Sequence, residues 1–93
     1  MYILECADGS FYVGSTWDLS ARFDQHCAGV VPGYTARRLP VVVRYAEEHD
    51  RIEDAYAREK QVQNWSRAKR LALIEGRIDD LRALSRASRK GER

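Results

Sequence analysis

The pattern of hydrophobic and polar positions predicts a β-hairpin at the start of the chain. Residues 2–6 and 11–15 are rich in strand-forming side chains, and the pair Asp8-Gly9 between them favours the positive φ angles of a hairpin turn. Alternate side chains of a strand point to opposite faces. Pairing through this turn can therefore put the hydroxyl groups of Tyr2 and Tyr12 on one face of the sheet.

A helix and a third strand are predicted after the hairpin. Asp18 is suited to cap the helix, and Gly29 to end it. Residues 30–40 contain two prolines and show no periodicity, so we predict a loop there. A third strand over 41–46 then begins behind Pro40, because proline is tolerated at the start of a strand. The apolar side of the helix is formed by residues that recur at a spacing of four, Leu19, Phe23 and Cys27.

The second half of the chain has a mainly helical pattern. One helix begins at Ile52, a second is capped by Ser66 and ended by Gly76, and a last one covers about 78–84. The order strand, strand, helix, strand and three helices predicts an α+β domain with a small three-stranded antiparallel sheet flanked by helices. The apolar side of the helix that begins at Ile52 is formed by Ile52, Ala55, Tyr56 and Val62.

A length of 93 residues allows one domain. We place it at residues 1–87 and interpret 88–93 as a solvated basic tail. No apolar run approaches the roughly 20 residues that a membrane span needs, so no membrane partner is expected. Two cysteines do not make a disulfide scaffold, which favours a reducing cytoplasm, with Cys6 and Cys27 as core residues.

The formal net charge of +2 conceals an asymmetry. Residues 1–50 carry 4 Lys and Arg against 7 Asp and Glu, whereas residues 51–93 carry 12 against 7. The net charge alone does not indicate a nucleic-acid partner, but the basic second half is suited to hold phosphates.

Glu59 interrupts the apolar side of the helix that begins at Ile52. At about 100° per residue, its side chain projects close to the direction of Ile52 and between Ala55 and Tyr56. A charge directed into a core is costly unless it is paired or binds a metal. Two interpretations stay open: a carboxylate at the edge of a cleft that pairs with an arginine, and a functional carboxylate.

Arg22 and His26 lie four residues apart on the first predicted helix, beside its apolar side. An arginine offers a fixed fork for a phosphate, and a histidine can donate or accept a proton near neutral pH. Taken alone, the pair favours the simpler interpretation of an amphipathic helix edge with a half-buried, hydrogen-bonded histidine. Gly14 adds a separate signal, because a glycine within a strand often marks the close approach of a ligand or of backbone.

Basic residues are interleaved with aromatic ones in two places. Arg37 and Arg38 lie in the predicted loop, next to Tyr34 and Thr35. Cations among aromatic rings suit a phosphate backbone and unstacked bases, although a solvated helix face explains most such runs. The second group adjoins Glu59, which favours a phosphodiester site. It surrounds Trp65 and comprises Arg58, Lys60, Arg67, Lys69 and Arg70.

In this order and spacing, the residues resemble the motifs of the GIY-YIG nucleases. Tyr2-Ile3-Leu4 and Tyr12-Val13-Gly14, with ten residues from the first tyrosine to the second, resemble the paired motif that names this superfamily. The chain looks most like its small, single-domain bacterial branch, and the resemblance covers about residues 1–75. The further matches are Asp18-Leu19, Arg22, His26, Tyr34-Thr35, Arg58-Glu59-Lys60, Trp65-Ser66-Arg67 and Lys69-Arg70.

The resemblance implies a nuclease that cleaves DNA phosphodiester bonds with one Mg²⁺ or Mn²⁺ ion, in DNA repair or recombination. Tyr2 would accept a proton from the attacking water, and Tyr12 would be the second motif tyrosine. Arg22 would hold the scissile phosphate, and His26 would assist proton transfer or position Tyr2. Glu59 would be the sole protein ligand of the metal, with water and phosphate oxygens completing its shell.

The resemblance also implies a set of DNA contacts. Met1 precedes Tyr2 where the motif has a glycine, which this branch tolerates. Gln63 stands where the branch often has a lysine four residues after the glutamate, so one backbone contact is expected to be weaker, with Asn64 as its neighbour. The expected substrate-binding residues are Gly14, Tyr34, Thr35, Arg37, Arg38, Lys60, Asn64, Arg67 and Lys69.

Two other functions stay open on the sequence. One is a nucleic-acid-binding module on the same fold with negligible cleavage, which the small size favours because stand-alone nucleases usually need a separate specificity domain. The other is a protein-interaction domain in which Glu59 and Arg22 form a structural ion pair. The presence of all five proposed catalytic residues favours the enzyme.

Overall fold

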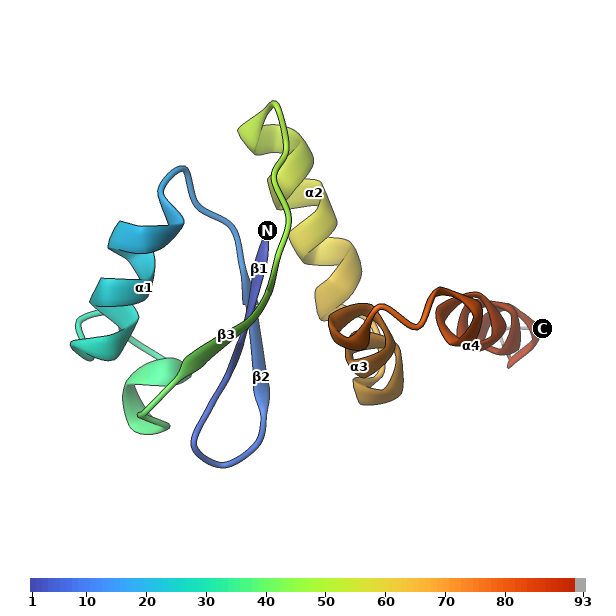
Figure 1. Cartoon of the computed structure of the whole chain (residues 1–93), viewed down its shortest axis with the longest axis horizontal. Helices are drawn as coiled ribbons and strands as arrows, with labels where there is room; N and C mark the ends of the chain where they lie inside the picture. The colour runs from blue at the N-terminus through green and yellow to red at the C-terminus, as the bar shows by residue number, and fades with distance from the viewer. Residues whose placement is uncertain (92–93) are drawn as a thin grey trace. The chain divides into compact units, whose positions relative to one another are not determined.

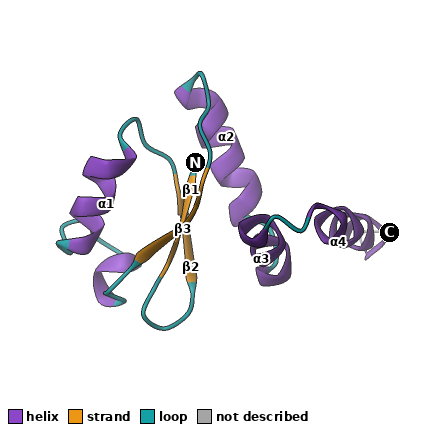
Figure 2. Ribbon diagram, in the orientation of Figure 1, coloured by secondary structure: helices purple, strands orange, loops and turns teal. Residues whose placement is uncertain are grey.

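The computed structural model describes residues 1–91, and the side chains of residues 1–85. Its order of elements is the predicted one, with a short 3₁₀ helix added in the loop, and it confirms the α+β class (Figures 1 and 2). The strands are β1 (Tyr2–Glu5), β2 (Phe11–Gly14) and β3 (Val42–Ala46), and the helices are α1 (Leu19–Cys27), η1 (Thr35–Arg37), α2 (Ile52–Gln63), α3 (Arg67–Glu75) and α4 (Ile78–Gly91).

The chain divides into two compact units, Met1–Gln63 and Asn64–Arg93. The first holds the sheet with α1 and α2, and the second holds α3 and α4. The boundary between a domain at 1–87 and a basic tail at 88–93 stays a prediction. Helix α4 extends through Gly91, and residues 92–93 of that tail lie outside the described residues.

The sheet has the strand order β2-β1-β3, and both pairs are antiparallel. Gly9 adopts a φ of +83° in the connection between β1 and β2, which confirms the predicted hairpin. The register pairs Tyr2 with Gly14 and Leu4 with Tyr12. Because paired residues share a face, the side chains of Tyr2 and Tyr12 project from the same side of the sheet, as the alternation predicts.

Helix α1 covers this face. Asp18 accepts a hydrogen bond from the amide of Ala21 at 3.1 Å, which confirms the predicted cap. The buried cluster on this side comprises Tyr2, Leu4, Cys6 and Val41, with Tyr12, Leu19 and Phe23 packed against it.

The expectation that Cys27 is a core residue is wrong, because its side chain is exposed. Four residues advance a helix by about 400°, so each step from Leu19 drifts about 40° away from the core direction. Cys27 lies two steps from Leu19, whereas His26 falls only about 20° from it on the same estimate. The histidine therefore takes the buried position on α1.

Helix α2 lies on the opposite side of the sheet from α1 (Figure 1). Its buried residues are Ala55 and Val62, and Ile3 and Val13 are buried on the strands. The expectation that Tyr56 belongs to the apolar side is wrong, because Tyr56 is 55% exposed and lies beneath the Lys60 ammonium. The apolar side is therefore narrower than the pattern predicts, and its edge lies at Glu59.

The second unit begins with the predicted cap, in which the Ser66 hydroxyl accepts from the amide of Lys69 at 3.2 Å. Gly76 ends α3 in the left-handed conformation, at a φ of +71°. Helices α3 and α4 contact each other. Across the residues that the structure describes, every helix is too short or too polar to cross a membrane.

Candidate active site

A buried chain of hydrogen bonds connects β1, α1 and η1. The Tyr2 hydroxyl lies 3.0 Å from Nε2 of His26, and Nδ1 of His26 lies 2.8 Å from Oγ1 of Thr35. The three residues are 2%, 0% and 1% exposed. Both ring nitrogens of the histidine thus have a partner, and the Thr35 hydroxyl is bonded to His26 in the interior.

Burial is the largest influence on the pKa values of Tyr2 and His26 in this hydrogen-bonded chain. It raises the pKa of Tyr2 to about 12, together with the neighbouring Tyr12, while the Arg22 guanidinium partly offsets the rise. Burial also lowers the pKa of His26, and the positive charge of Arg22 adds to that effect. At neutral pH, Tyr2 is therefore a protonated phenol, and His26 is a neutral imidazole able to accept one proton.

Gly14 leaves space for the ring of Tyr2. A Cβ atom at this position would lie 2.6 Å from the Tyr2 hydroxyl oxygen and 3.0 Å from Cε1 of Tyr12, both too close. The ring of Tyr12 lies 6.3 Å from that of Tyr2 and 5.1 Å from that of His26, centre to centre. The close approach that a strand glycine predicts is therefore made by a tyrosine of the site.

The Glu59 carboxylate is held by one residue that follows β2 and by two neighbours on its own helix, α2. Ser15, just after β2, donates to its Oε1 at 2.7 Å. The Gln63 amide, one turn further along α2, donates to its Oε2 at 2.9 Å and to the carbonyl of Val13 at 3.1 Å. The Lys60 ammonium lies 3.3 Å from the same Oε2. The side chain of Glu59 is 12% exposed, so the carboxylate is nearly buried at the edge of α2.

Arg22 does not share these contacts. Its Nη1 donates to the side-chain oxygen of Gln25 at 3.1 Å, one turn along α1. Among the described residues it forms no ion pair with Glu59 of the kind that a protein-interaction domain would use. Arg22 is half-buried, and its guanidinium is close enough to the Tyr2 hydroxyl to lower the pKa of that group.

The Glu59 carboxylate suits one hydrated divalent ion. The described residues contain no group of three or more His, Cys, Asp and Glu side chains that could enclose a metal. Mg²⁺ does not need such a cage, because it keeps several waters and binds through one or two carboxylates together with substrate phosphates. Oε1 of Glu59 accepts one described hydrogen bond, from Ser15, and so retains a second lone pair for an ion.

The loop that carries Arg37 and Arg38 is tied to the hairpin. Nε of Arg38 lies 3.0 Å from a carboxylate oxygen of Asp8, and its guanidinium lies 3.8 Å from the ring centre of Tyr34. Arg38 thus holds the loop against the turn of the hairpin, whereas the side chain of Arg37 is exposed. Tyr34 is 40% exposed, so one face of its ring carries the arginine while part of the side chain is open to solvent.

Three of the expected substrate-binding residues belong to the second unit. Asn64 and Arg67 are exposed, whereas Lys69 is buried, and its ammonium lies 4.4 Å from the ring centre of Trp65. Their roles stay predictions.

Sequence reasoning missed two residues that contact Glu59. Gln63 carries a signal, because a residue four positions after Glu59 lies above it on the same face of a helix. Ser15 carries only a weak one, since it directly follows the strand that ends at Gly14. Thr35 is expected to contact substrate, but its side chain is buried against His26.

Comparison with known proteins adds the family context. The family model described as the GIY-YIG catalytic domain matches residues 1–72. A UPF0213 protein of Streptococcus sanguinis is 44% identical over 80 residues, which cover 86% of this chain and 92% of that protein. A UPF0213 protein of Halobacterium salinarum is 40% identical over 74 residues, covering 80% and 96%. One from Staphylococcus aureus is 38% identical over 77 residues, covering 83% and 94%. No solved structure matches the chain.

Proposed function

The chain belongs to the GIY-YIG family, and we propose that it is an endonuclease that hydrolyses DNA phosphodiester bonds with one Mg²⁺ or Mn²⁺ ion. The observation that carries the proposal is the buried chain from Tyr2 through His26 to Thr35. A tyrosine hydroxyl that is hydrogen-bonded to a neutral histidine can move a proton, which hydrolysis requires. DNA repair and recombination supply branched and single-stranded DNA, and these are the substrates to test first.

Tyr2 takes up the proton of the attacking water. A pKa of about 12 leaves very little free phenolate at neutral pH, so Tyr2 hands its own proton to Nε2 of His26 as it receives one from the water. His26 accepts it because the lowered pKa keeps the imidazole neutral beforehand. This step requires the tautomer with its proton on Nδ1, which then donates to the Thr35 hydroxyl and stabilises the imidazolium.

Arg22 holds the scissile phosphate. Its guanidinium offers two parallel donors for phosphate oxygens, and one of its Nη atoms now donates to the neutral amide of Gln25. Exchange of that hydrogen bond for a charge-assisted one favours binding of the anion. Because the charge on the phosphate oxygens grows in the transition state, a fixed cation there also lowers the barrier.

Glu59 would hold the divalent ion, and Ser15 and Gln63 keep its carboxylate oriented. When bound, such an ion offsets the charge of the phosphate oxygens and lowers the pKa of a bound water.

One contact favours a second candidate, the nucleic-acid-binding module without cleavage. The Lys60 ammonium lies 3.3 Å from Oε2 of Glu59 and offsets the charge that would hold the ion. Lys60 is exposed, however, so water screens the pair and the ammonium can swing away when a divalent ion competes.

The test is cleavage of supercoiled, single-stranded and branched DNA with Mg²⁺ or Mn²⁺. We expect His26→Ala to lose activity by at least about 100-fold, as removal of a general acid–base group does. Glu59→Ala should lose metal-dependent cleavage because the proposed ligand of the ion is gone. Glu53→Ala, which removes an exposed carboxylate from the first turn of the same helix, is the matched control and should keep full activity. Metal-dependent cleavage by Glu59→Ala at the wild-type rate contradicts the proposal. Absence of cleavage together with binding that weakens steeply with salt supports the second candidate.

A further inference from the structure

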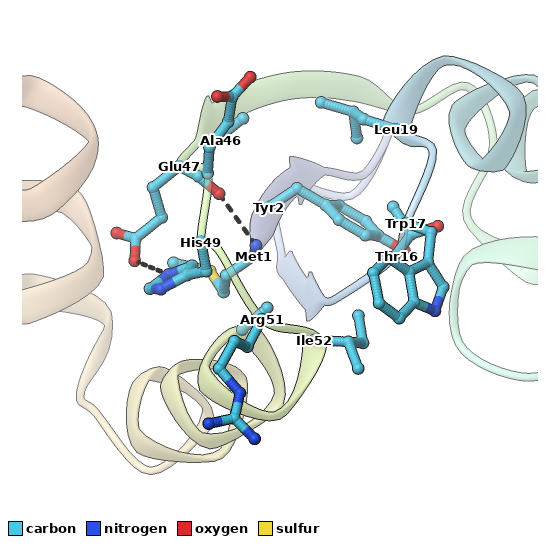
Figure 3. A pocket seen from close by; sticks show the side chains of 12 residues that line it. Met1, Tyr2, Thr16, Trp17, Leu19, Ala46, Glu47, His49, Arg51 and Ile52 are labelled. Carbon is cyan, nitrogen blue, oxygen red and sulfur yellow. Dashed lines mark hydrogen bonds and ion pairs between the residues drawn. The ribbon is translucent and has the colours of Figure 1, made fainter.

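A hollow of about 450 Å³ opens in the first unit, and Tyr2 is among the residues that line it (Figure 3). In Figure 3 the side chains of Tyr2, Trp17 and Ile52 lie toward one side of it, and those of Glu47 and His49 lie toward the other. Its volume falls within the range of about 300–1,000 Å³ that is typical of small-ligand sites. The proposed reaction uses Tyr2 but leaves this space without a role.

Trp17 is the most exposed of the large hydrophobic side chains at 82%. It lies in the segment between β2 and α1, and at this exposure its indole contributes little to the core. Tryptophan is usually well buried in folded proteins, and it is enriched where proteins recognise partners. A single exposed hydrophobic residue would need no explanation, but this one stands at the rim of a hollow that contains a proposed catalytic tyrosine.

A second hollow of about 450 Å³ is also lined by Trp17, together with Arg22. Thr16, Trp17 and Ile52 border both hollows. Trp17 therefore lines both the hollow that Tyr2 lines and the hollow that the proposed phosphate-binding arginine lines.

Charges of both signs line the first hollow, because the Arg51 guanidinium lies there with the carboxylates of Glu47 and Glu48. Nε of Arg51 lies 3.3 Å from Oε2 of Glu53, so its charge is also paired and does not favour an anion over a neutral ligand. The Glu47 carboxylate accepts hydrogen bonds from Tyr45 at 2.8 Å and from His49 at 2.6 Å, and Arg58 lies 3.2 Å away. These partners compensate the negative charge of Glu47, and the carboxylate itself does not attract a phosphate. A neutral aromatic group with hydrogen-bonding edges suits such walls, whereas a phosphate suits the neighbouring hollow at Arg22.

We propose that Trp17 stacks on an unpaired nucleobase that enters the hollow lined by Tyr2, while Arg22 holds the adjacent phosphate. The inference rests on the proposed function and names its substrate class, a single strand of nucleic acid or an unpaired strand at a branch. A base within a duplex has both faces covered by its neighbours, so only an unpaired base can offer a face to the indole.

The test measures binding without metal, so that it does not depend on cleavage. Fluorescence anisotropy in EDTA compares single-stranded DNA, single-stranded RNA and duplex DNA of one sequence, and a single strand whose central nucleotides are abasic. Trp17→Ala should weaken binding of either intact single strand about tenfold, the usual loss when one base loses its aromatic partner. It should change binding of the abasic strand less than twofold. Trp17→Phe keeps a ring and should recover most of the affinity.

Two variants serve as controls and reporters. Tyr56→Ala removes another exposed aromatic residue of this unit, outside both hollows, and should bind the intact strand within twofold of wild type. Trp65→Phe leaves Trp17 as the single tryptophan, so its fluorescence should be quenched by the intact strand and unchanged by the abasic one.

The proposal is overturned if Trp17→Ala weakens the intact and abasic strands equally, or if it leaves the binding of the intact strand unchanged. Tighter binding of the DNA or of the RNA strand identifies the sugar that the site accepts. If metal-dependent cleavage fails but binding depends on Trp17, stacking is supported and the nuclease proposal fails. If duplex DNA is cut at equal rates by wild type and Trp17→Ala, the nuclease proposal stands and stacking fails.

Discussion

The hydroxyl of Tyr2 lies 3.0 Å from Nε2 of His26, and both side chains are shielded from solvent. This bond joins the first strand to the first helix, and it gives the histidine two roles. As a neutral base it can take up a proton from Tyr2, and as a buried group it makes the stability of the fold depend on pH.

The free energy of unfolding should fall as the pH is lowered from 7 to 5. An unperturbed histidine has a pKa of about 6.5, and the pKa of His26 is lower because of burial and the nearby Arg22 charge. Between these two values the unfolded chain binds more protons than the folded one, so the free energy of unfolding rises with pH. The contribution of His26 is fully present above about pH 6.5. Chemical denaturation at several pH values should show a smaller fall for His26→Gln.

Thr35→Val should lower activity even though the side chain of Thr35 is buried against His26. Valine has nearly the same shape but leaves Nδ1 of His26 unpaired in the interior, at a cost of about 1–3 kcal/mol in unfolding free energy. The loss of this partner also shifts the pH dependence of kcat, because nothing then fixes the tautomer. Thr35→Ser keeps the hydroxyl and should restore both the profile and most of the rate. An unchanged pH profile in the valine variant would remove the positioning role of Thr35.

Gly14→Ala should displace Tyr2. The added methyl group would lie 2.6 Å from the hydroxyl oxygen of Tyr2, and the buried ring has little room to move. Overpacking of this kind costs about 1–3 kcal/mol, and we expect a lower Tm together with loss of cleavage. A double-mutant cycle with Tyr2→Leu checks the cause, because the cost of the alanine should shrink once the ring is removed. An equal cost in both backgrounds would point to a backbone effect instead.

Gln63→Ala should weaken metal binding. The Gln63 amide donates to Glu59 and to the Val13 carbonyl, so it holds the carboxylate against β2. Removal of a group that orients a metal ligand typically costs about 10–100-fold in affinity. Titration calorimetry with Mn²⁺ measures this directly. Gln61→Ala replaces a neighbouring exposed glutamine that contacts Arg58 instead, and it should bind Mn²⁺ like wild type. If both variants bind equally well, Gln63 has no part in the metal site.

Some features of the site were predictable because they depend on neighbours in the sequence. The caps at Asp18 and Ser66 are satisfied by amides three residues further along, which is a property of any helix start. The placement of Tyr2 and Tyr12 on one face follows from strand alternation and a short turn. Cys27 and Tyr56 show the limit of such reasoning, because periodicity ranks the positions on a helix but does not say how wide a face the sheet covers.

The sequence by itself determined the order of the elements, the antiparallel hairpin and the family of this protein, since these follow from local patterns and motif spacing. Only the tertiary structure decided that Thr35 is bonded to His26, that Ser15 and Gln63 hold Glu59, and that the exposed Trp17 lines two hollows. The physical reason is that a side-chain hydrogen bond needs its atoms about 3 Å apart. For Ser15 and Glu59 that distance joins residues 44 positions apart, and it is set by how the sheet and helices pack rather than by the periodicity of either segment.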